Sequence, residues 1–475
     1  MNILFATSEA TPFAQSGGLG EVAGALPKAL VQKGQDVRII MPLYACVSEE
    51  QRSQFTFLCH FNVPVAWRTQ YCGVFEAKVG DVTYYLLDNE YYFKRPGLYG
   101  YYDDAERFTF FSRAVLETIS HIDGFKPDII HCNDWQTALI PLYYNCFYKD
   151  YYGYDNIRTV YTIHNIQYQG IYGNDLLNEV IGINPPDYSL VDYDGLVNFS
   201  KSAVECCNKV TTVSPSYANE ILDPWFSHGL DHILHKNLWK LTGILNGIDT
   251  DSYNPETDPA LGHNYSATDK ANKAKCKEDL ETQFGLEHKP DVPIIALVSR
   301  LVSHKGLDLL TAIIDELLDN AEIRFIVLGA GDVQYEDYFR GVAARHPDKF
   351  RLELGFHPAL ARQVYAGADI FLMPSKSEPC GLSQMIALRY GTIPIVRETG
   401  GLRDSVTDCG DGIGNGFTFK TYNAHDMLDA IYRSLDLYYN NKDAWKNLVD
   451  RAMNCDNSWA KSADIYIQMY NEARM

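Results

Sequence analysis

The chain has 475 residues, 46% of them hydrophobic, and a formal net charge of -20 at pH 7. A chain of this length exceeds what one hydrophobic core organises, so we expect two domains of about 200 to 250 residues. Nucleic acid and anionic membrane surfaces bind clustered Lys and Arg, so the acidic balance argues against both as the main partner and leaves a neutral polymer allowed.

The first residues contain no basic segment or cleavage site typical of a secretory signal, and no apolar run approaches the roughly eighteen residues of a membrane span. We therefore expect a cytoplasmic protein without a membrane partner. Eleven cysteines are scattered from Cys46 to Cys455 with no C-x-x-C pair. This pattern favours reduced, mostly buried thiols over a metal site or a redox dithiol.

Apolar strands alternate with helical patterns in both halves, which is typical of β-α-β units with parallel sheets. The first series of predicted strands covers residues 3–6, 37–41, 84–87, 129–132, 159–163 and 209–213. The second series covers residues 240–245, 294–298, 324–328, 350–354, 370–373 and 393–396. We therefore predict two α/β domains, each with its own parallel sheet.

The boundary between the two series is predicted near residues 240–250, where the turn Asn246-Gly247-Ile248-Asp249 precedes a stretch rich in Asn, Asp, Pro and Thr. We expect an N-terminal domain at 1–240, a C-terminal domain at 241–457 and a last helix within 458–475. Trp459, Ala463, Tyr466 and Met469 share one side of that helix by the helical period. We expect the helix to cross back to the first domain.

A glycine-rich loop, Gln15-Ser16-Gly17-Gly18-Leu19-Gly20, follows the first predicted strand and leads into a helix expected at residues 22–33. Paired glycines let a backbone approach a diphosphate, and the helix directs its N-terminal amides at the same place. The loop therefore favours a site for the phosphates of a sugar nucleotide. An ordinary strand-to-helix turn is the alternative interpretation.

Polar side chains follow two further strands of the first half, in the segments His131-Cys132-Asn133-Asp134-Trp135 and His164-Asn165. Ligands of open parallel sheets bind beyond the carboxyl ends of the strands, so Asp134 and His164 are expected to face one cleft. A helix N-cap is the alternative role for Asp134, and a structural imidazole is the alternative for His164.

The second half places two cations after a strand, Arg300 at its end and Lys305 at the start of the next helix. An Arg grips two phosphate oxygens and a Lys adds a point charge, so the pair predicts an anion site. Surface salt bridging is the alternative interpretation, because such pairs are common.

Two more loops of the second half resemble ligand-binding turns. In the segment Pro374 to Leu382, Glu378 would stand at the cleft, and the amides near a helix expected at 383–390 would point at a phosphate. The segment Thr399-Gly400-Gly401-Leu402 again joins a strand, a glycine pair and a helix. Two glycine loops and a cation pair are hard to explain by turns alone.

These motifs, in this order, resemble the bacterial glycogen synthases, which are relatives of the plant starch synthases, from the first residues to the last. The family's lysine-x-glycine-glycine-leucine loop corresponds to Gln15 through Leu19, and its histidine-x-x-aspartate-tryptophan segment to His131 through Trp135. The resemblance implies a GT-B architecture, in which two Rossmann-like, doubly wound domains face each other across a deep cleft.

The resemblance also implies an activity: transfer of glucose from ADP-glucose to the non-reducing 4-hydroxyl end of an α-1,4-glucan, with retention of configuration and without a metal or other cofactor. Arg300 and Lys305 would hold the donor diphosphate and stabilise its charge on departure. Glu378 would bind the 3- and 4-hydroxyls of the glucosyl unit, while His164 and Asp134 would orient the sugar from the other domain.

Further site residues are implied by the same resemblance. The donor site would include Gln15, Gly17, Gly18, Asn246, Phe356, Cys380, Gly381, Leu382, Thr399, Gly400 and Gly401. The acceptor side of the cleft would include Glu9, Glu21 and Asn165.

The sequence departs from the family pattern at four places. Gln15 replaces the lysine of the glycine loop, Glu21 replaces an aspartate, Lys376-Ser377 replaces an arginine-aromatic pair, and Ile386 stands where related retaining transferases have a second glutamate. Gln15 motivates one alternative to the enzyme, a glucan-binding homologue with little transfer. Another alternative is a transferase that uses UDP-glucose or makes another glycoside, since Gln15 and Lys376-Ser377 could change the choice of donor. Catalysis is favoured by the joint presence of Arg300, Lys305, Glu378 and His164.

Overall fold

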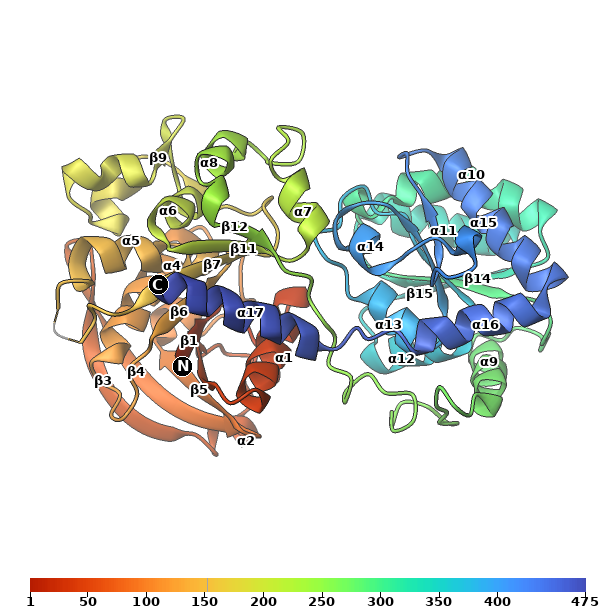
Figure 1. Cartoon of the computed structure of the whole chain (residues 1–475), viewed down its shortest axis with the longest axis horizontal. Coiled ribbons are helices and arrows are strands. Elements are labelled where there is room, and N and C mark those ends of the chain that lie inside the picture. The colour runs from red at the N-terminus through yellow and green to blue at the C-terminus, as the bar shows by residue number, and fades with distance from the viewer. Residues whose placement is uncertain (152) are drawn as a thin grey trace. The chain divides into compact units, whose positions relative to one another are not determined.

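The computed structural model describes residues 1–151 and 153–475. The chain divides into two compact units, one formed by residues 1–246 together with 459–475, the other by residues 247–458. Each unit has a largely parallel sheet with helices packed on it (Figure 1).

The sheet of the first unit has nine strands in the described ranges, in the order β12-β11-β7-β6-β1-β2-β5-β4-β3. Its strands are β1 (Asn2–Ala6), β2 (Asp36–Pro42), β3 (Thr56–Val65), β4 (Arg68–Val79), β5 (Val82–Asp88), β6 (Ile129–Asn133), β7 (Arg158–Ile163), β11 (Lys209–Thr212) and β12 (Leu241–Gly243). Neighbours from β12 to β5 are parallel, whereas β4 and β3 are antiparallel. The strand order reverses between β1 and β6.

Helices and short turns cover this sheet. The helices are α1 (Gly18–Gln32), α2 (Glu49–Arg52), α3 (Glu90–Phe93), α4 (Asp104–Ile119), α5 (Leu139–Tyr143), α6 (Phe199–Cys206), α7 (Pro215–Glu220), α8 (Asp231–Lys236) and α17 (Trp459–Arg474). Short helical turns are η1 (Trp135–Thr137), η2 (Tyr144–Tyr148), η3 (Leu177–Ile181), η4 (Pro185–Leu190) and η5 (Leu238–Lys240), and a small sheet joins β8 (Ile171–Tyr172), β10 (Leu196–Asn198) and β9 (Asp192–Tyr193).

The sheet of the second unit has six parallel strands in the described part of the chain, in the order β15-β14-β13-β16-β17-β18. They are β13 (Ile294–Val298), β14 (Arg324–Gly329), β15 (Phe350–Leu354), β16 (Ile370–Met373), β17 (Ile393–Arg397) and β18 (Phe417–Phe419). Numbered along the chain, the order is 3-2-1-4-5-6, the doubly wound arrangement, and it reverses between β13 and β16.

The helices of the second unit are α9 (Ala271–Gln283), α10 (Leu307–Asn320), α11 (Val333–Arg345), α12 (Pro358–Gly367), α13 (Ser383–Arg389), α14 (Gly400–Ser405), α15 (Ala424–Asn440) and α16 (Lys442–Met453). Two short turns are η6 (Ser303–Lys305) and η7 (Cys409–Asp411). The core joins apolar residues of α10 and α15 to the strands, for example Leu310, Phe325 and Ile431, all 0% exposed.

Two predictions about elements are wrong. Residues 240–245 were expected to open the second sheet, but β12 pairs in parallel with β11 in the first unit. An apolar run in the sequence does not indicate which strand it pairs with, because the pairing depends on how the rest of the chain folds. The first helix begins at Gly18 instead of residue 22, because Gly18 and Gly20 add no apolar side chain to the periodic pattern.

The last helix, α17, belongs to the first unit and lies beside α1 there (Figure 1). Its expected apolar side is buried, from Trp459 to Met469. Tyr470 donates or accepts a hydrogen bond of 2.7 Å at Nδ1 of buried His131 in β6. Lys33 forms an ion pair of 2.6 Å with Asp464.

The cysteines are less buried than expected. In the described ranges all eleven are free thiols, and Cys46 is exposed. The buried ones are Cys72, Cys132, Cys207, Cys276 and Cys380. Isolated cysteines in a sequence give no indication of which strand or helix face they occupy.

Candidate active site

The reversal of strand order marks where ligands bind in doubly wound sheets, beyond the carboxyl ends of the strands on either side. In the first unit these strands are β1 and β6, which are followed by the glycine loop and by Asp134. In the second unit they are β13 and β16, which are followed by Arg300 and by Glu378. Most of the residues predicted from the sequence therefore lie at these two reversals, each within its own unit.

The glycine loop is organised around a buried carboxylate. Glu9 is 2% exposed, and its Oε2 accepts a hydrogen bond of 2.6 Å from the backbone N–H of Ser16. Burial raises the pKa of Glu9, although the backbone amides of the loop, including those of Gly17 and Gly20, act to lower it. Some amides expected to hold a phosphate are thus directed at a carboxylate of the protein itself.

The outer face of this loop is open. A Cβ added at Gly17 or at Gly18 would have no heavy atom within 4 Å. The side chain of Gln15 is exposed, and its Nε2 lies 3.3 Å from Oε1 of Glu21 and 3.4 Å from the carbonyl oxygen of Gly17. The loop can therefore be approached closely by a ligand, with a neutral amide where the family pattern has a cation.

Asp134 ties the ends of two strands together. Its backbone has a φ of 57°, a left-handed conformation that is uncommon outside glycine, and its side chain makes no N-cap hydrogen bond to η1. Instead Oδ1 accepts a hydrogen bond of 2.7 Å from the backbone N–H of His164. Burial raises the pKa of Asp134 to about 7, opposed by the amides of His164 and Asn165. The N-cap alternative is wrong.

The imidazole of His164 is held in one tautomer. Its Nε2 lies 2.9 Å from Oδ1 of Asn133, whose amide nitrogen donates to the carbonyl oxygens of Ala6 and His131. Oδ1 of Asn133 is therefore an acceptor, so Nε2 of His164 bears the proton and Nδ1 is an acceptor. Burial lowers the pKa of His164 to about 3, which keeps the ring neutral.

Asn133 was not predicted as a site residue, and its position directly before Asp134 was the available signal. Asn165 is half-buried, and its Oδ1 accepts a hydrogen bond of 3.0 Å from the backbone N–H of Gln167. This turn shapes the loop after β7.

The two cations of the second unit differ in their surroundings. Arg300 is exposed at the end of β13. Nζ of Lys305 forms an ion pair of 2.6 Å with Oε2 of Glu378, and the two side chains are 18% and 10% exposed. Ser375, which was not predicted, donates from its hydroxyl to the same Oε2 at 3.0 Å. Lys305 is therefore in an ion pair, as the alternative interpretation expected, but the pair is largely buried and does not lie at the surface.

Glycines hold the loops of this edge against one another. A Cβ at Gly306 would lie 2.0 Å from the carbonyl oxygen of Pro374, and one at Gly401 would lie 2.2 Å from that of Cys380. Gly400 has a φ of 45°, and its Cβ would lie 2.0 Å from the carbonyl oxygen of Glu378. The pair Gly400-Gly401 thus packs directly on the loop that contains Glu378.

The remaining predicted residues have contrasting exposures. Phe356 is 85% exposed after β15, whereas Thr399 and Cys380 are buried. Leu382 is half-buried at the start of α13. Asn246 is 5% exposed, and its Oδ1 has no hydrogen-bond partner among the described residues. Phe356 therefore offers a ring face and Asn246 an acceptor.

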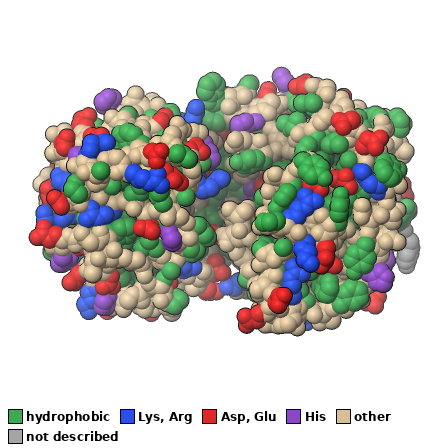
Figure 2. Space-filling view, turned by 180° about the vertical axis from the view of Figure 1, so that it is seen from behind, with side chains coloured by type: hydrophobic (Ala, Val, Ile, Leu, Met, Phe, Trp, Pro, Cys, Tyr) green, Lys and Arg blue, Asp and Glu red, His purple; other side chains and the backbone are tan. Residues whose placement is uncertain are grey.

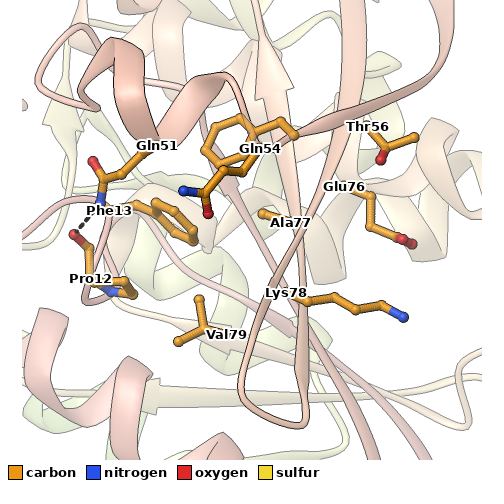
Figure 3. A pocket seen from close by; sticks show the side chains of 10 residues that line it. Pro12, Phe13, Gln51, Gln54, Thr56, Glu76, Ala77, Lys78 and Val79 are labelled. Carbon is orange, nitrogen blue, oxygen red and sulfur yellow. Dashed lines mark hydrogen bonds between the residues drawn. The ribbon is translucent and has the colours of Figure 1, made fainter.

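A pocket of about 460 Å³ lies elsewhere in the first unit, between the β3–β4 pair and the segment that leads to the glycine loop (Figure 3). It is lined by Phe13, Gln51, Glu76 and Lys78 among others, and Gln51 donates to the carbonyl oxygen of Pro12. None of the predicted site residues lines it. We do not place the active site there.

The distribution of charged side chains on the surface agrees with the acidic net charge of the chain (Figure 2). On the face shown in Figure 2, Lys and Arg side chains are interspersed with Asp and Glu and form no continuous basic area among the described residues. None of the helices in the described ranges combines the length and the apolar character that crossing a bilayer requires.

Comparisons with known proteins identify the family. Residues 2–236 match the model described as "Starch synthase catalytic domain", and residues 279–451 match "Glycosyl transferases group 1". The chain is 48% identical to a glycogen synthase of Clostridium acetobutylicum and 47% identical to one of Bacillus cereus, in both cases over 99% of each chain. The chain belongs to the glycogen synthase family.

Solved structures agree with this family. The catalytic domain of starch synthase IV from Arabidopsis thaliana, bound to ADP and acarbose, matches with a TM-score of 0.92 and 36% identity over 100% of this chain and 99% of that one. A sucrose-phosphate synthase from Thermosynechococcus elongatus shares the fold, with a TM-score of 0.62 and 17% identity over 99% of this chain and 98% of that one. This glycogen synthase family member is a glycosyltransferase with the GT-B fold, as the sequence predicted.

Proposed function

We propose that the protein transfers glucose from ADP-glucose to the non-reducing 4-hydroxyl end of an α-1,4-glucan, with retention of configuration and with no metal or cofactor. The observation that supports this most directly is the gathering of Arg300, Lys305 and Glu378 at the strand reversal of the second unit. An ADP-bound starch synthase of closely similar structure supports the donor. A cytoplasmic location stays a prediction from the sequence.

The buried ion pair suggests how donor binding and sugar binding are linked. Oε2 of Glu378 accepts hydrogen bonds from Lys305 and Ser375, so its carboxylate is oriented without a ligand. Glu378 would accept hydrogen bonds from the glucosyl hydroxyls through its remaining lone pairs. Lys305 would divide its three N–H donors between Glu378 and the diphosphate, while exposed Arg300 would bind the diphosphate alone.

The first unit would supply orientation to the sugar. Asp134 holds the backbone of His164 in place, and Asn133 fixes its ring, so Nδ1 of His164 is a neutral acceptor of defined direction. We assign this atom to a hydroxyl of the glucosyl unit. A neutral acceptor binds a hydroxyl without altering the charge of the site.

In the transfer step, the bond between C1 of glucose and the phosphate oxygen breaks, and a bond forms between C1 and the acceptor's 4-oxygen on the same face. The proton of that 4-hydroxyl passes to the departing phosphate oxygen. Charge on the ADP is then stabilised by Arg300 and Lys305, which act as preorganised cations. No protein nucleophile is required by this route.

Incubation of the purified protein with glycogen and either ADP-glucose or UDP-glucose tests the proposal, with incorporated glucose as the measurement. Incorporation from ADP-glucose, released again by an enzyme specific for α-1,4 bonds, is expected. Preference for UDP-glucose would overturn the donor assignment. Binding of glycogen without incorporation from either donor would overturn catalysis and leave a glucan-binding protein.

A further inference from the structure

Gln384, in the first turn of α13, is a buried amide between two loops of the second unit. Its side chain is 0% exposed. Nε2 donates hydrogen bonds to the carbonyl oxygens of Cys380 at 3.1 Å and Gly381 at 2.8 Å, and to the hydroxyl of Ser405 at 3.0 Å. Because carbonyl oxygens only accept, the nitrogen must occupy this side of the amide, and Oε1 must occupy the other.

Oε1 of Gln384 has no hydrogen-bond partner among the described residues. Buried polar side-chain atoms nearly always have a hydrogen-bond partner. We therefore look for the partner of Oε1 outside the chain. A Cβ built on Gly381 would lie 2.6 Å from this oxygen and 3.1 Å from Cγ of Glu378. Oε1 therefore lies beside the Glu378 side chain, on the side of Gly381 where another residue would carry its Cβ.

The position of this oxygen is fixed by a small network. The hydroxyl of Ser405 accepts a hydrogen bond from Nε2 of Gln384 and donates one of 2.6 Å to the carbonyl oxygen of Gly401. The backbone N–H of Gly401 donates to the carbonyl oxygen of Glu378 at 3.2 Å. One amide thus cross-links the Glu378 loop and α14, and Oε1 cannot turn away without breaking the hydrogen bonds that the two N–H groups of Nε2 make to three acceptors.

The chemistry of the missing partner is restricted. A carboxamide oxygen accepts hydrogen bonds and repels a phosphate oxygen, so it cannot bind the diphosphate. It suits a hydroxyl. We propose that Oε1 of Gln384 accepts a hydrogen bond from the 3- or 4-hydroxyl of the transferred glucosyl unit, beside Glu378, and so contributes to selection of the sugar. The inference rests on the proposed function.

This pairing has a consequence for selectivity. A site that buries an acceptor for a substrate hydroxyl rejects an analogue that lacks it, because the acceptor is then left unpaired. A donor without the bound hydroxyl should be transferred poorly by the unaltered enzyme, and it should be insensitive to loss of the Gln384 amide oxygen.

The test compares kcat/KM of the unaltered enzyme with that of Gln384→Met, which keeps the length of the side chain. Four donors are used: ADP-glucose and its 3-deoxy, 4-deoxy and 6-deoxy analogues, with the deoxy position in the glucosyl unit. We expect kcat/KM with ADP-glucose to fall about 100-fold, with a loss at least tenfold smaller for the 3-deoxy or the 4-deoxy donor. The 6-deoxy donor should show the full loss. Equal losses with all four donors would overturn the proposal.

Ser405→Ala is the matched control, because it removes a partner of Nε2 and leaves Oε1 in place. It should lower kcat/KM by the same factor with every donor. A donor-dependent pattern like that of Gln384→Met would mean that the cross-link, and not the oxygen, sets selectivity.

A crystal structure of the unaltered protein with ADP and glucose decides the question even if Gln384→Met fails to fold. Oε1 within about 3.5 Å of the 3- or 4-oxygen supports the proposal, and only water within that distance overturns it. Absence of transfer from ADP-glucose by the unaltered protein would instead refute the proposed function, so the two failures are distinct.

Discussion

Arg300 and Lys305 lie after the same strand but in different electrostatic surroundings. Replacing either by Ala should lower turnover about 10²-fold, because each removes a preorganised charge from the departing diphosphate. Arg300→Ala should leave stability unchanged, since that side chain is exposed. Lys305→Ala should also lower the free energy of unfolding by about 3 kcal/mol, because it leaves the Glu378 carboxylate buried and unpaired.

Turnover assays and urea unfolding of the two variants measure these effects separately. The double variant Lys305→Ala with Glu378→Gln should recover stability without recovering activity. If Lys305→Ala is as stable as Arg300→Ala, the buried ion pair does not contribute as the geometry implies.

Gln15 is the second residue whose replacement is informative. Gln15→Lys should tighten ADP-glucose binding by about 1 kcal/mol, since charge-assisted hydrogen bonds are about twice as strong as neutral ones. The gain should be limited by Glu21, whose Oε1 lies 3.3 Å from Nε2 of Gln15 and would pair with the new cation.

Adding Glu21→Gln to Gln15→Lys should therefore enlarge the gain, and high salt should reduce it. Calorimetric titration with ADP-glucose measures both variants. An unchanged or weaker affinity in the double variant would show that position 15 points away from the diphosphate.

Asp134 gives a prediction about pH. Its pKa is raised to about 7 in the folded protein by burial, so the folded state holds a proton that the unfolded chain releases near pH 4. The contribution of Asp134 to stability is therefore fully present below pH 4 and is lost as pH rises to about 7. The lowered pKa of His164 acts in the opposite direction.

Comparison with Asp134→Asn separates the two, because Asn cannot titrate and has nearly the size and shape of Asp. Denaturant unfolding should show the variant gaining stability relative to the unaltered protein between pH 5 and pH 8. A constant difference across this range would mean that Asp134 is ionised throughout.

At the scale of the element, the loops of the two units use glycine for different reasons. Gly401→Ala should destabilise the protein by about 1–3 kcal/mol, because its Cβ would meet the backbone of Cys380 at 2.2 Å. Gly17→Ala should fold normally, because its Cβ would meet nothing within 4 Å and its φ of -163° suits any residue.

If a ligand approaches the glycine loop closely, Gly17→Ala should still lose donor or acceptor affinity. Thermal unfolding and a substrate titration of both variants give the two readouts. Normal kinetics in Gly17→Ala would show that the loop is only a strand-to-helix turn.

The prediction of elements from sequence succeeded where the signal was local. Strands such as β13 and β16 are short, wholly apolar and bounded by polar turns, so their ranges were predicted to the residue. The β3–β4 pair was missed, because most of its β3 side chains are exposed or half-buried and the apolar alternation is weak.

At the scale of the whole molecule, α17 closes the first unit through a buried polar contact. Tyr470→Phe should lower the free energy of unfolding of this unit by about 1–3 kcal/mol, because it leaves Nδ1 of His131 buried without its partner. The second unit should be unaffected. Hydrogen exchange resolved by peptide can report on each unit.

Asp464→Ala is a suitable control, because it removes a more exposed contact of the same helix, the ion pair with Lys33. Its cost should be below about 1 kcal/mol. Equal effects of the two substitutions would argue that α17 is held by its apolar side alone.

The sequence by itself determined the fold class, the family and the order of the site motifs. It could do so because glycine loops, cations after strands and apolar periodicity are local patterns, each visible within one short segment of the sequence. The same reasoning placed Arg300, Glu378 and His164 in the segments that follow strands, where the structure has them.

Only the tertiary structure decided what these residues contact. Three contacts are examples: Lys305 with Glu378, Glu9 with the glycine loop, and Asp134 with the backbone of His164. In each, the number of residues between the partners does not indicate how far apart they lie in space. The position of the unpaired oxygen of Gln384 depends on two partners in the Glu378 loop and one in α14. Such contacts are set by strand order and loop packing, because these bring the carboxyl ends of distant strands to one edge of a sheet.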